Sequence, residues 1–236
     1  MHILRRVLDL LLPDHCLLCG IGLEVRSSHL MCPHCWLALP RNITACRVCA
    51  QHLPVPGVCG ACQLEPLVSG RTIAPLNHID EAKYLIHQFK YHHDFRAGQA
   101  LASLIAWEVR RTYQDQPLPQ CMVPVPLSYI RQVQRGYNQA AWLGRCLRKE
   151  LHIPLATHAI TRRHGPAQHT LSRRARLRFK THSLRQKRAL PYAHVAIIDD
   201  VLTTGATCSA MARILKSHGA KQIDIWCATR TQANRN

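Results

Sequence analysis

Two adjacent carboxylates followed by a hydroxyl-rich turn form the most chemically specific stretch of the sequence. The apolar run 195–198 leads into Asp199 and Asp200, and the turn after them contains Thr203, Thr204, Gly205, Ala206 and Thr207. In such a turn, backbone N–H groups and hydroxyls can converge on a phosphate, and the dipole of the following helix adds positive potential. Two carboxylates would normally repel a neighbouring phosphate, so they are expected to have a binding role, such as accepting hydrogen bonds from sugar hydroxyls directly or acting through Mg²⁺. The stretch predicts a ribose 5-phosphate site with Asp199 and Asp200 as its catalytic pair, against the simpler interpretation of a capped strand-to-helix turn.

A second group of residues could hold a pyrophosphate. Arg131 and Arg135 follow the apolar segment 121–125, and residues 135–139 read Arg-Gly-Tyr-Asn-Gln. These cations and amides would lie near the carboxyl end of a strand, where open α/β sheets bind ligands. Lys90, at the end of a predicted helix, is a further candidate cation or else a solvated helix-end lysine. In an enzyme, displacement at ribose C1 would release pyrophosphate, whose developing charge Mg²⁺ and the cations would stabilise.

The cysteines indicate a metal-binding module. The sequence has 12 cysteines, and most of them form Cys-x-x-Cys pairs between residues 16 and 62. One such turn presents two thiolates to a tetrahedral Zn²⁺, and two turns complete a closed structural site. We therefore expect one or two structural zinc ions held by Cys16, Cys19, Cys32, Cys35, Cys46, Cys49, Cys59 and Cys62. Sequential pairing of the turns is simplest; interleaved pairing, a single retained site and a redox role are the alternatives. The other four cysteines lie in apolar elements and are expected in the core.

Composition and charge limit the location and the partners. The net charge of +18 favours polyanions such as nucleic acid, phosphorylated small molecules or an anionic membrane surface. No stretch approaches the roughly 18 apolar residues that span a bilayer, so no integral membrane segment is expected. Clustered cysteines typical of metal ligation indicate a reducing compartment. We expect a cytoplasmic protein, with peripheral association at the inner face of the membrane as the further option.

The elements that must position these residues alternate between strand and helix. Apolar periodicity predicts strands over 71–76, 121–125, 195–198 and 223–229, and helices over 1–12, 81–91, 97–111, 138–151 and 206–218. The fold class is therefore α/β with a doubly wound parallel sheet. Residues 162–188, rich in Arg and Lys and without an acid, are predicted to be a mobile basic loop. We place the domain boundary so that 1–66 forms the N-terminal helix and cysteine module and 67–236 the α/β domain.

Two resemblances extend this interpretation. Residues 195–207 resemble the phosphoribosyl pyrophosphate (PRPP) signature of type I phosphoribosyltransferases over their whole length. The order of the Cys-x-x-Cys pairs, Phe-Lys-Tyr at 89–91, Pro-Val-Pro at 124–126, Arg-Gly-Tyr-Asn-Gln, Gln168 with Leu171-Ser172 and Arg176, and the acid-pair turn resembles the ComF/GntX competence-related family. One departure is Ala175 where relatives usually have Glu, with Phe179 in place of Asn. The resemblance implies a double zinc ribbon, a phosphoribosyltransferase-like domain and a role in DNA uptake and utilisation, with other DNA-uptake proteins as partners.

Two hypotheses on function follow. The first is a phosphoribosyltransferase that moves the phosphoribosyl group from PRPP, with Mg²⁺, to an unidentified acceptor. The second is a non-catalytic protein that binds single-stranded DNA and uses the PRPP site as a sensor, because residues 121–198 contain a single acid, Glu150, among many cations. Tyr137, Trp142 or Phe179 could then stack on bases. No helix-turn-helix is recognisable, which argues against a transcription regulator.

Overall fold

A computed structural model describes residues 15–23, 30–65, 67, 69–127, 129–162 and 184–232. The helix predicted over 1–12 lies outside the described residues. The same holds for the central part of the predicted basic loop, including Gln168, Leu171, Ser172, Arg176 and Phe179.

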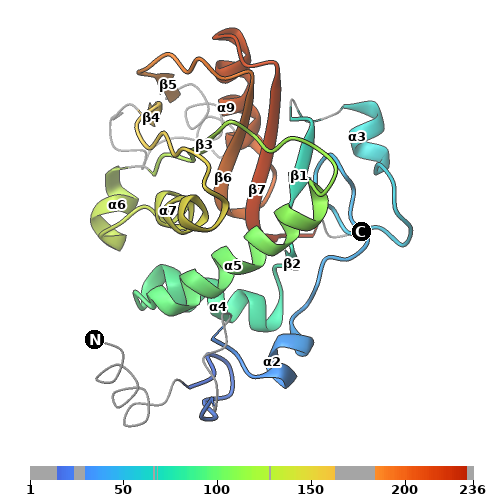
Figure 1. The fold of residues 1–236 in the computed structure, drawn as a ribbon, viewed down its shortest axis with the longest axis vertical. Helices are drawn as coiled ribbons and strands as arrows, with labels where there is room; N and C mark the ends of the chain where they lie inside the picture. Colours follow the sequence, from blue (N-terminus) through green and yellow to red (C-terminus); the bar gives the residue numbers. More distant parts are fainter. Residues whose placement is uncertain are drawn as a thin grey trace, which may run out of the picture.

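A parallel five-stranded sheet forms the centre of the molecule (Figure 1). Its strands run in the order β1-β7-β6-β3, with β2 also paired to β7. All the pairings in this sheet are parallel. The strands are β1 (Arg71–Ile73), β2 (Leu76–Asn77), β3 (Cys121–Pro124), β6 (His194–Leu202) and β7 (Gln222–Arg230). Their carboxyl ends therefore meet at one edge, where open α/β sheets place their ligand sites.

Helices cover both faces of this sheet, which confirms the doubly wound α/β fold (Figure 1). One face packs against α4 (Asp80–Tyr91), α5 (Phe95–Thr112) and α7 (Gln139–Leu151). The other packs against α9 (Ala206–Ser217). Successive residues of a strand point to opposite faces, so a strand buried on both sides must be apolar throughout. In β6, Ala196 and Ile198 face the first group of helices, and Val195 and Ile197 face α9.

The helices begin where polar side chains can cap them. The Asp94 carboxylate accepts from the backbone N–H groups of Arg96 and Ala97 at the start of α5. Asn138 accepts from the N–H of Ala141 in the same way at α7. Such caps satisfy N–H groups that have no partner inside the helix. They also fix the places where α5 and α7 begin to cover the sheet.

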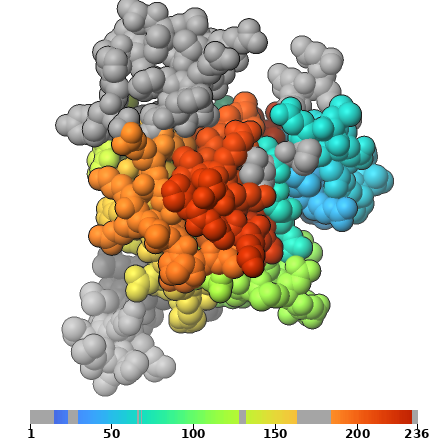
Figure 2. All heavy atoms as spheres, turned by 90° about the horizontal axis from the view of Figure 1, so that it is seen from above, coloured from blue at the N-terminus to red at the C-terminus, as the bar shows by residue number. Residues whose placement is uncertain are grey.

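The remaining elements are short. Helix α6 (Tyr129–Arg135) follows β3, and α2 (Pro33–Ala38) and α3 (Gly60–Leu64) lie in the cysteine-rich part. Strands β4 (Ile160–Arg162) and β5 (Leu184–Gln186) form a separate antiparallel pair. In the space-filling view, the blue-to-cyan flank of the molecule is formed by the cysteine-rich part, beside the orange-red surface of α9 (Figure 2).

Several expectations need refinement. The predicted strand 71–76 is divided into β1 and β2, with Pro75 in the gap; proline has no N–H to offer a neighbouring strand. Strand β6 runs through both aspartates to Leu202, because β7 pairs with it almost to its end. Near its two ends the predicted basic loop includes Arg162, the last residue of β4, and the whole of β5. Three of the four remaining cysteines are buried as expected, and Cys146 packs against the core while partly exposed.

Gly98 of α5 lies so close to two aromatic rings that a larger residue at this position should destabilise the protein. A Cβ atom on Gly98 would lie 2.5 Å from Cε2 of Phe89 and 2.8 Å from Cζ3 of Trp142. Gly98→Ala should lower the free energy of unfolding by about 1–3 kcal/mol, because two packed rings must move. Urea denaturation measures this change. Gly60→Ala is the matched control, since nothing lies within 4 Å of its added Cβ; equal stability of the two variants would contradict the packing argument.

Candidate phosphate site and metal centres

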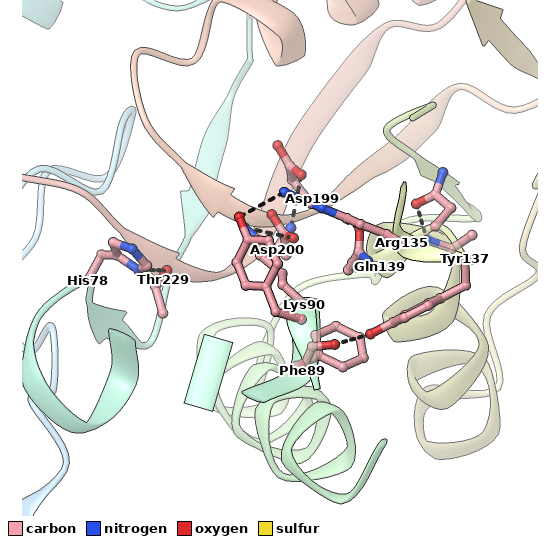
Figure 3. Close-up of polar contacts among 12 residues, drawn as sticks. His78, Phe89, Lys90, Arg135, Tyr137, Gln139, Asp199, Asp200 and Thr229 are labelled. Carbon is pink, nitrogen blue, oxygen red and sulfur yellow. Dashed lines mark hydrogen bonds and ion pairs between the residues drawn. The ribbon is translucent and has the colours of Figure 1, made fainter. Parts of the chain in front are cut away.

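The carboxylates predicted to form the site lie near the carboxyl end of β6, and one of them, Asp200, meets a lysine from α4 (Figure 3). The Nζ of Lys90 is 3.0 Å from Oδ2 of Asp200, and both side chains are largely buried. Lys90 is therefore not a solvated helix-end lysine. A shielded pair of this kind is strongly coupled electrostatically, and removing one partner leaves the other charge uncompensated. The structure thus pairs Lys90 with Asp200, whereas Oδ2 of Asp199 lies 3.9 Å from Sγ of Cys208 in α9.

Asp199 differs from its neighbour. The N–H of Asp200 donates to Oδ1 of Asp199 at 2.9 Å. Burial, followed by the negative charge of Asp200, raises the pKa of Asp199 to about 7, while Lys90 opposes the rise. A carboxylate that changes charge near neutral pH at the mouth of a ligand site is typical of functional positions. Asp199 is therefore expected to change its protonation near neutral pH.

The predicted phosphate turn lies directly after β6. Gly205 has φ of 74° and is the N-cap of α9, with no side chain capping the helix. A positive φ favours glycine, which offers no capping side chain, and the N–H of Ala206 at the start of α9 donates instead to Oγ1 of Thr204 at 3.4 Å. Thr203 and Thr204 are exposed, and Ala206 and Thr207 are half-buried. The turn presents hydroxyls and a helix N-terminus beside the acid pair, which is the arrangement that binds phosphate.

Arg135 reaches the same region from α6. Its Nη1 donates to Oε1 of Gln139 at 3.2 Å, and its Nη2 to the hydroxyl of Tyr91 at 3.3 Å. The guanidinium also lies over the Tyr91 ring, 5.2 Å from its centroid. Arg131 is in α6 as well, but its side chain lies outside the described residues. Of the two predicted arginines, only Arg135 has described side-chain contacts, and these join it to Tyr91 of α4 and Gln139 of α7.

Two further side chains, Gln139 and His78, lie in the same region (Figure 3). Gln139 is 2% exposed, and its Nε2 finds no acceptor among the described residues. A buried amide donor without an acceptor costs free energy, so a ligand that accepts from it would be favoured. His78 contacts the Thr229 hydroxyl through Nδ1 at 3.0 Å, and burial together with Lys90 lowers its pKa. Gln139 belongs to a recognisable motif, whereas His78 carries no sequence signal.

Two cysteine clusters have the geometry of zinc sites. Cys16, Cys19, Cys32 and Cys35 form one cluster, and Cys46, Cys49, Cys59 and Cys62 form the other, with all ligand atoms of a cluster within 4.8 Å of one another. This is the sequential pairing of the turns. Sγ–Sγ distances of 3.8 Å (Cys19–Cys32) and 3.6 Å (Cys49–Cys59) match the edge of about 3.8 Å that a tetrahedron with Zn–S bonds of about 2.3 Å requires. None of the cysteines forms a disulfide.

Backbone N–H groups point at the cluster sulfurs. The N–H of Cys32 is 3.4 Å from Sγ of Cys16, and that of Cys59 is 3.3 Å from Sγ of Cys46. Burial opposes ionisation of both thiols, but these and other backbone donors outweigh it and lower the pKa of Cys16 to about 6 and of Cys46 to about 7. Thiolates are the form that binds metal. Both sites fit Zn²⁺, which would hold the two turns of each cluster together.

Comparisons with known proteins agree with this geometry. Residues 7–63 match the family described as a double zinc ribbon domain. The chain is 34% identical to the DNA utilization protein YhgH of Escherichia coli K12, over 94% of this chain and 99% of that protein. It is 32% identical to competence protein F of Haemophilus influenzae, over 89% and 94%. It is 26% identical to competence protein ComFC of Bacillus subtilis, over 91% and 83%.

A structural comparison gives a weaker match. The fold overlaps a hypoxanthine phosphoribosyltransferase from Staphylococcus aureus at 15% identity and a TM-score of 0.35, over 59% of this chain and 70% of that one. Too little is shared for this overlap to support an argument.

The parallel sheet covered by helices and the attached cysteine clusters define an α/β protein with an N-terminal double zinc ribbon. The similarity to YhgH and to competence protein F covers 94% and 89% of this chain, which shows the family to which it belongs. The chain belongs to the ComF/GntX competence-related family. Within the described residues, no helix is both long and apolar enough to cross a membrane.

The raised pKa of Asp199 predicts a stability cost that depends on pH. Below about pH 4 the side chain is protonated in folded and unfolded chains alike, so it costs nothing. Between pH 4 and about 7 the unfolded chain holds the proton less tightly, so the cost grows, and it is complete above pH 7. Asp199→Asn should therefore raise Tm by at least about 3 °C at pH 8 and have little effect at pH 4. Calorimetric melting at both pH values tests this, with exposed Asp115→Asn as the control; a variant that is less stable at pH 8 would contradict it.

Proposed function

We propose that this protein binds PRPP at the carboxyl edge of its sheet and transfers the phosphoribosyl group to an acceptor. The observation that carries the proposal is the meeting of the acid pair, Lys90 and the turn 203–207 at one end of β6. The turn would take the 5-phosphate, and the acids would accept from the ribose hydroxyls. Lys90 and Arg135 would offset the charge of the pyrophosphate, together with Arg131 if its side chain faces the site. These roles remain predictions from geometry and sequence.

The acid pair also fits Mg²⁺. Hard cations prefer carboxylate oxygens, and Mg²⁺ is commonly held by one or two carboxylates together with substrate phosphates. Asp199 and Asp200 offer such oxygens at the sheet edge. When bound, Mg²⁺ would neutralise charge that builds on the leaving pyrophosphate. The thiolate clusters suit Zn²⁺ and are distinct in donor chemistry from this site.

The reaction would exchange one bond at ribose C1. The bond from C1 to the pyrophosphate oxygen breaks, the electron pair leaves with pyrophosphate, and C1 forms a bond to the acceptor nucleophile. The residues of this chain contribute by positioning the substrate and stabilising charge, not by forming covalent intermediates.

Calorimetric titration with PRPP tests the first half of this proposal. Zinc-loaded wild type should bind PRPP in the presence of Mg²⁺ and bind it much more weakly without the metal. Asp199→Asn combined with Asp200→Asn should lower the affinity at least 100-fold, because two charge-assisted contacts worth roughly 1.5–3 kcal/mol each are lost. The Asp115→Asn variant should bind as wild type does, since Asp115 is exposed and outside the site.

Two results would count against it. If folded, zinc-loaded wild type does not bind PRPP at any Mg²⁺ concentration, the proposed ligand is wrong. If PRPP binds but the double variant binds equally well, the acid pair is not part of the site. Pyrophosphate release with candidate acceptors then addresses the transfer step separately from binding.

We further propose that the activity serves the use of DNA, as the names of the relatives indicate. Complementation of an Escherichia coli strain that lacks YhgH tests this, scored by growth on DNA as the carbon source. Wild type and Asp115→Asn should restore growth, whereas Asp200→Asn should not, because it removes the partner of Lys90. Full restoration by Asp200→Asn would show that the phosphate site is not required for this role.

A further inference from the structure

The cluster of Cys46, Cys49, Cys59 and Cys62, called here the second cysteine site, is held against the edge of the sheet by hydrogen bonds to its own backbone carbonyls. In β1, the N–H of Thr72 donates to the carbonyl of Arg47 at 3.0 Å. The hydroxyl of the same threonine donates to the carbonyl of Val48 at 2.6 Å. Both carbonyls lie inside the turn between Cys46 and Cys49. The sheet therefore forms hydrogen bonds with the metal-binding turn itself and not with a neighbouring linker.

Arg230 makes the next contact along this turn. It ends β7, is 8% exposed, and its Nε donates to the carbonyl of the ligand residue Cys49 at 2.8 Å. The same guanidinium reaches the other way through Nη1. That nitrogen donates to the carbonyl oxygens of Leu202 at 3.0 Å, of Thr231 at 2.5 Å, and of Thr203. One buried side chain thus bridges a zinc-ligand residue and the first residue of the phosphate turn.

The charge of Arg230 makes this bridge sensitive to its surroundings. Among the described residues no carboxylate forms an ion pair with it, so its guanidinium depends on carbonyl acceptors for compensation. A buried cation that loses one acceptor must recover another or bring in water. Its planar donor groups are fixed relative to one another, so a shift of the Cys49 carbonyl is passed to the Leu202 and Thr203 carbonyls.

A second, apolar contact also connects the second cysteine site with the phosphate turn. Leu67 packs with Cys46, Cys49 and Cys62 in one apolar cluster. Its methyl carbons lie 3.5 and 3.6 Å from where a Cβ of Gly205 would stand. The N-cap of α9 therefore rests on a side chain that is itself supported by the second site. Two independent contacts, one polar and one apolar, connect this metal site with the turn 203–207.

The first cysteine site is attached elsewhere. Cys16 packs in the core cluster formed with α4 and α5, and Arg96 of α5 donates to the carbonyl of His15 at 2.9 Å. Cys19 and Cys35 line a surface pocket together with Asp80 and Tyr84 of α4. These contacts involve the amino-terminal parts of α4 and α5. The two metal sites thus differ in what they support, and the first provides a control.

We propose that Arg230 makes the phosphate turn depend on the metal in the second cysteine site, so that the turn is ordered for PRPP only when that site holds zinc. Arg230 acts here as a positioning residue. Zinc fixes the Cys46–Cys49 turn, the Cys49 carbonyl fixes the guanidinium, and the guanidinium fixes Thr203. Only the final consequence, PRPP affinity, rests on the proposed function; the effect on the turn does not.

Hydrogen exchange in the ligand-free protein tests the coupling directly. Cys59→Ser removes a ligand of the second site and Cys19→Ser a ligand of the first, and zinc content confirms that each variant has lost one ion. Exchange of the Ser209 and Thr231 amides, which donate to the carbonyls of Gly205 and Leu202 at 2.8 and 3.0 Å, should become at least tenfold faster in Cys59→Ser and stay within twofold of wild type in Cys19→Ser. Equal effects of the two variants, or no effect of Cys59→Ser, would overturn the proposal.

Arg230→Lys separates the bridge from the metal. Lysine keeps the charge but has one terminal nitrogen, which cannot serve Cys49 and the turn together as the guanidinium does. We expect two bound zinc ions, faster exchange of the Ser209 and Thr231 amides and PRPP affinity reduced at least tenfold. Wild-type exchange of the Ser209 and Thr231 amides in this variant would overturn the role of Arg230. If wild type does not bind PRPP, the proposed ligand fails, but the exchange results still decide the coupling.

Discussion

The ion pair between Lys90 and Asp200 is the interaction on which the arrangement of the site depends. Strand β6 has to be apolar to lie between two layers of helices, yet it must end in two acids beside a phosphate turn. A cation from α4 makes this tolerable by offsetting one carboxylate. The pKa of Asp199 is raised to about 7, which reflects the free-energy cost of burying a second carboxylate beside Asp200. The apolar face that seats α4 on the sheet is therefore also what delivers Lys90 to the acids.

Much of the fold could be predicted from local patterns. The apolar run 195–198 and the helix faces of α4, α5 and α7 have periods that depend only on nearby residues, and the structure confirms these elements. Cys-x-x-Cys spacing likewise predicted metal ligation but left the pairing open, because spacing alone does not say which turns meet in space. The clusters decide this in favour of sequential pairing. The assigned roles of the phosphate-turn residues stay predictions.

The features that the sequence did not predict are those formed by distant residues. Arg230 looks like a cation at the end of an apolar strand, and nothing nearby shows that a cysteine turn accepts its hydrogen bond. His78 is a histidine outside any motif that becomes part of the site only because β2 lies beside β7. The break at Pro75 was visible in the sequence, but whether a proline ends a strand or divides it depends on the neighbouring strand.

The contact between Cys49 and Arg230 also has a consequence for biogenesis. The two residues are 181 positions apart in the chain. During synthesis, the cysteine turns emerge first and can take up zinc as small local units, whereas their seat on the sheet exists only after β7 has been made and inserted beside β6. For much of translation, the loaded ribbon would therefore have exposed carbonyls and an unpaired apolar side, a state in which chaperones could recognise the nascent protein.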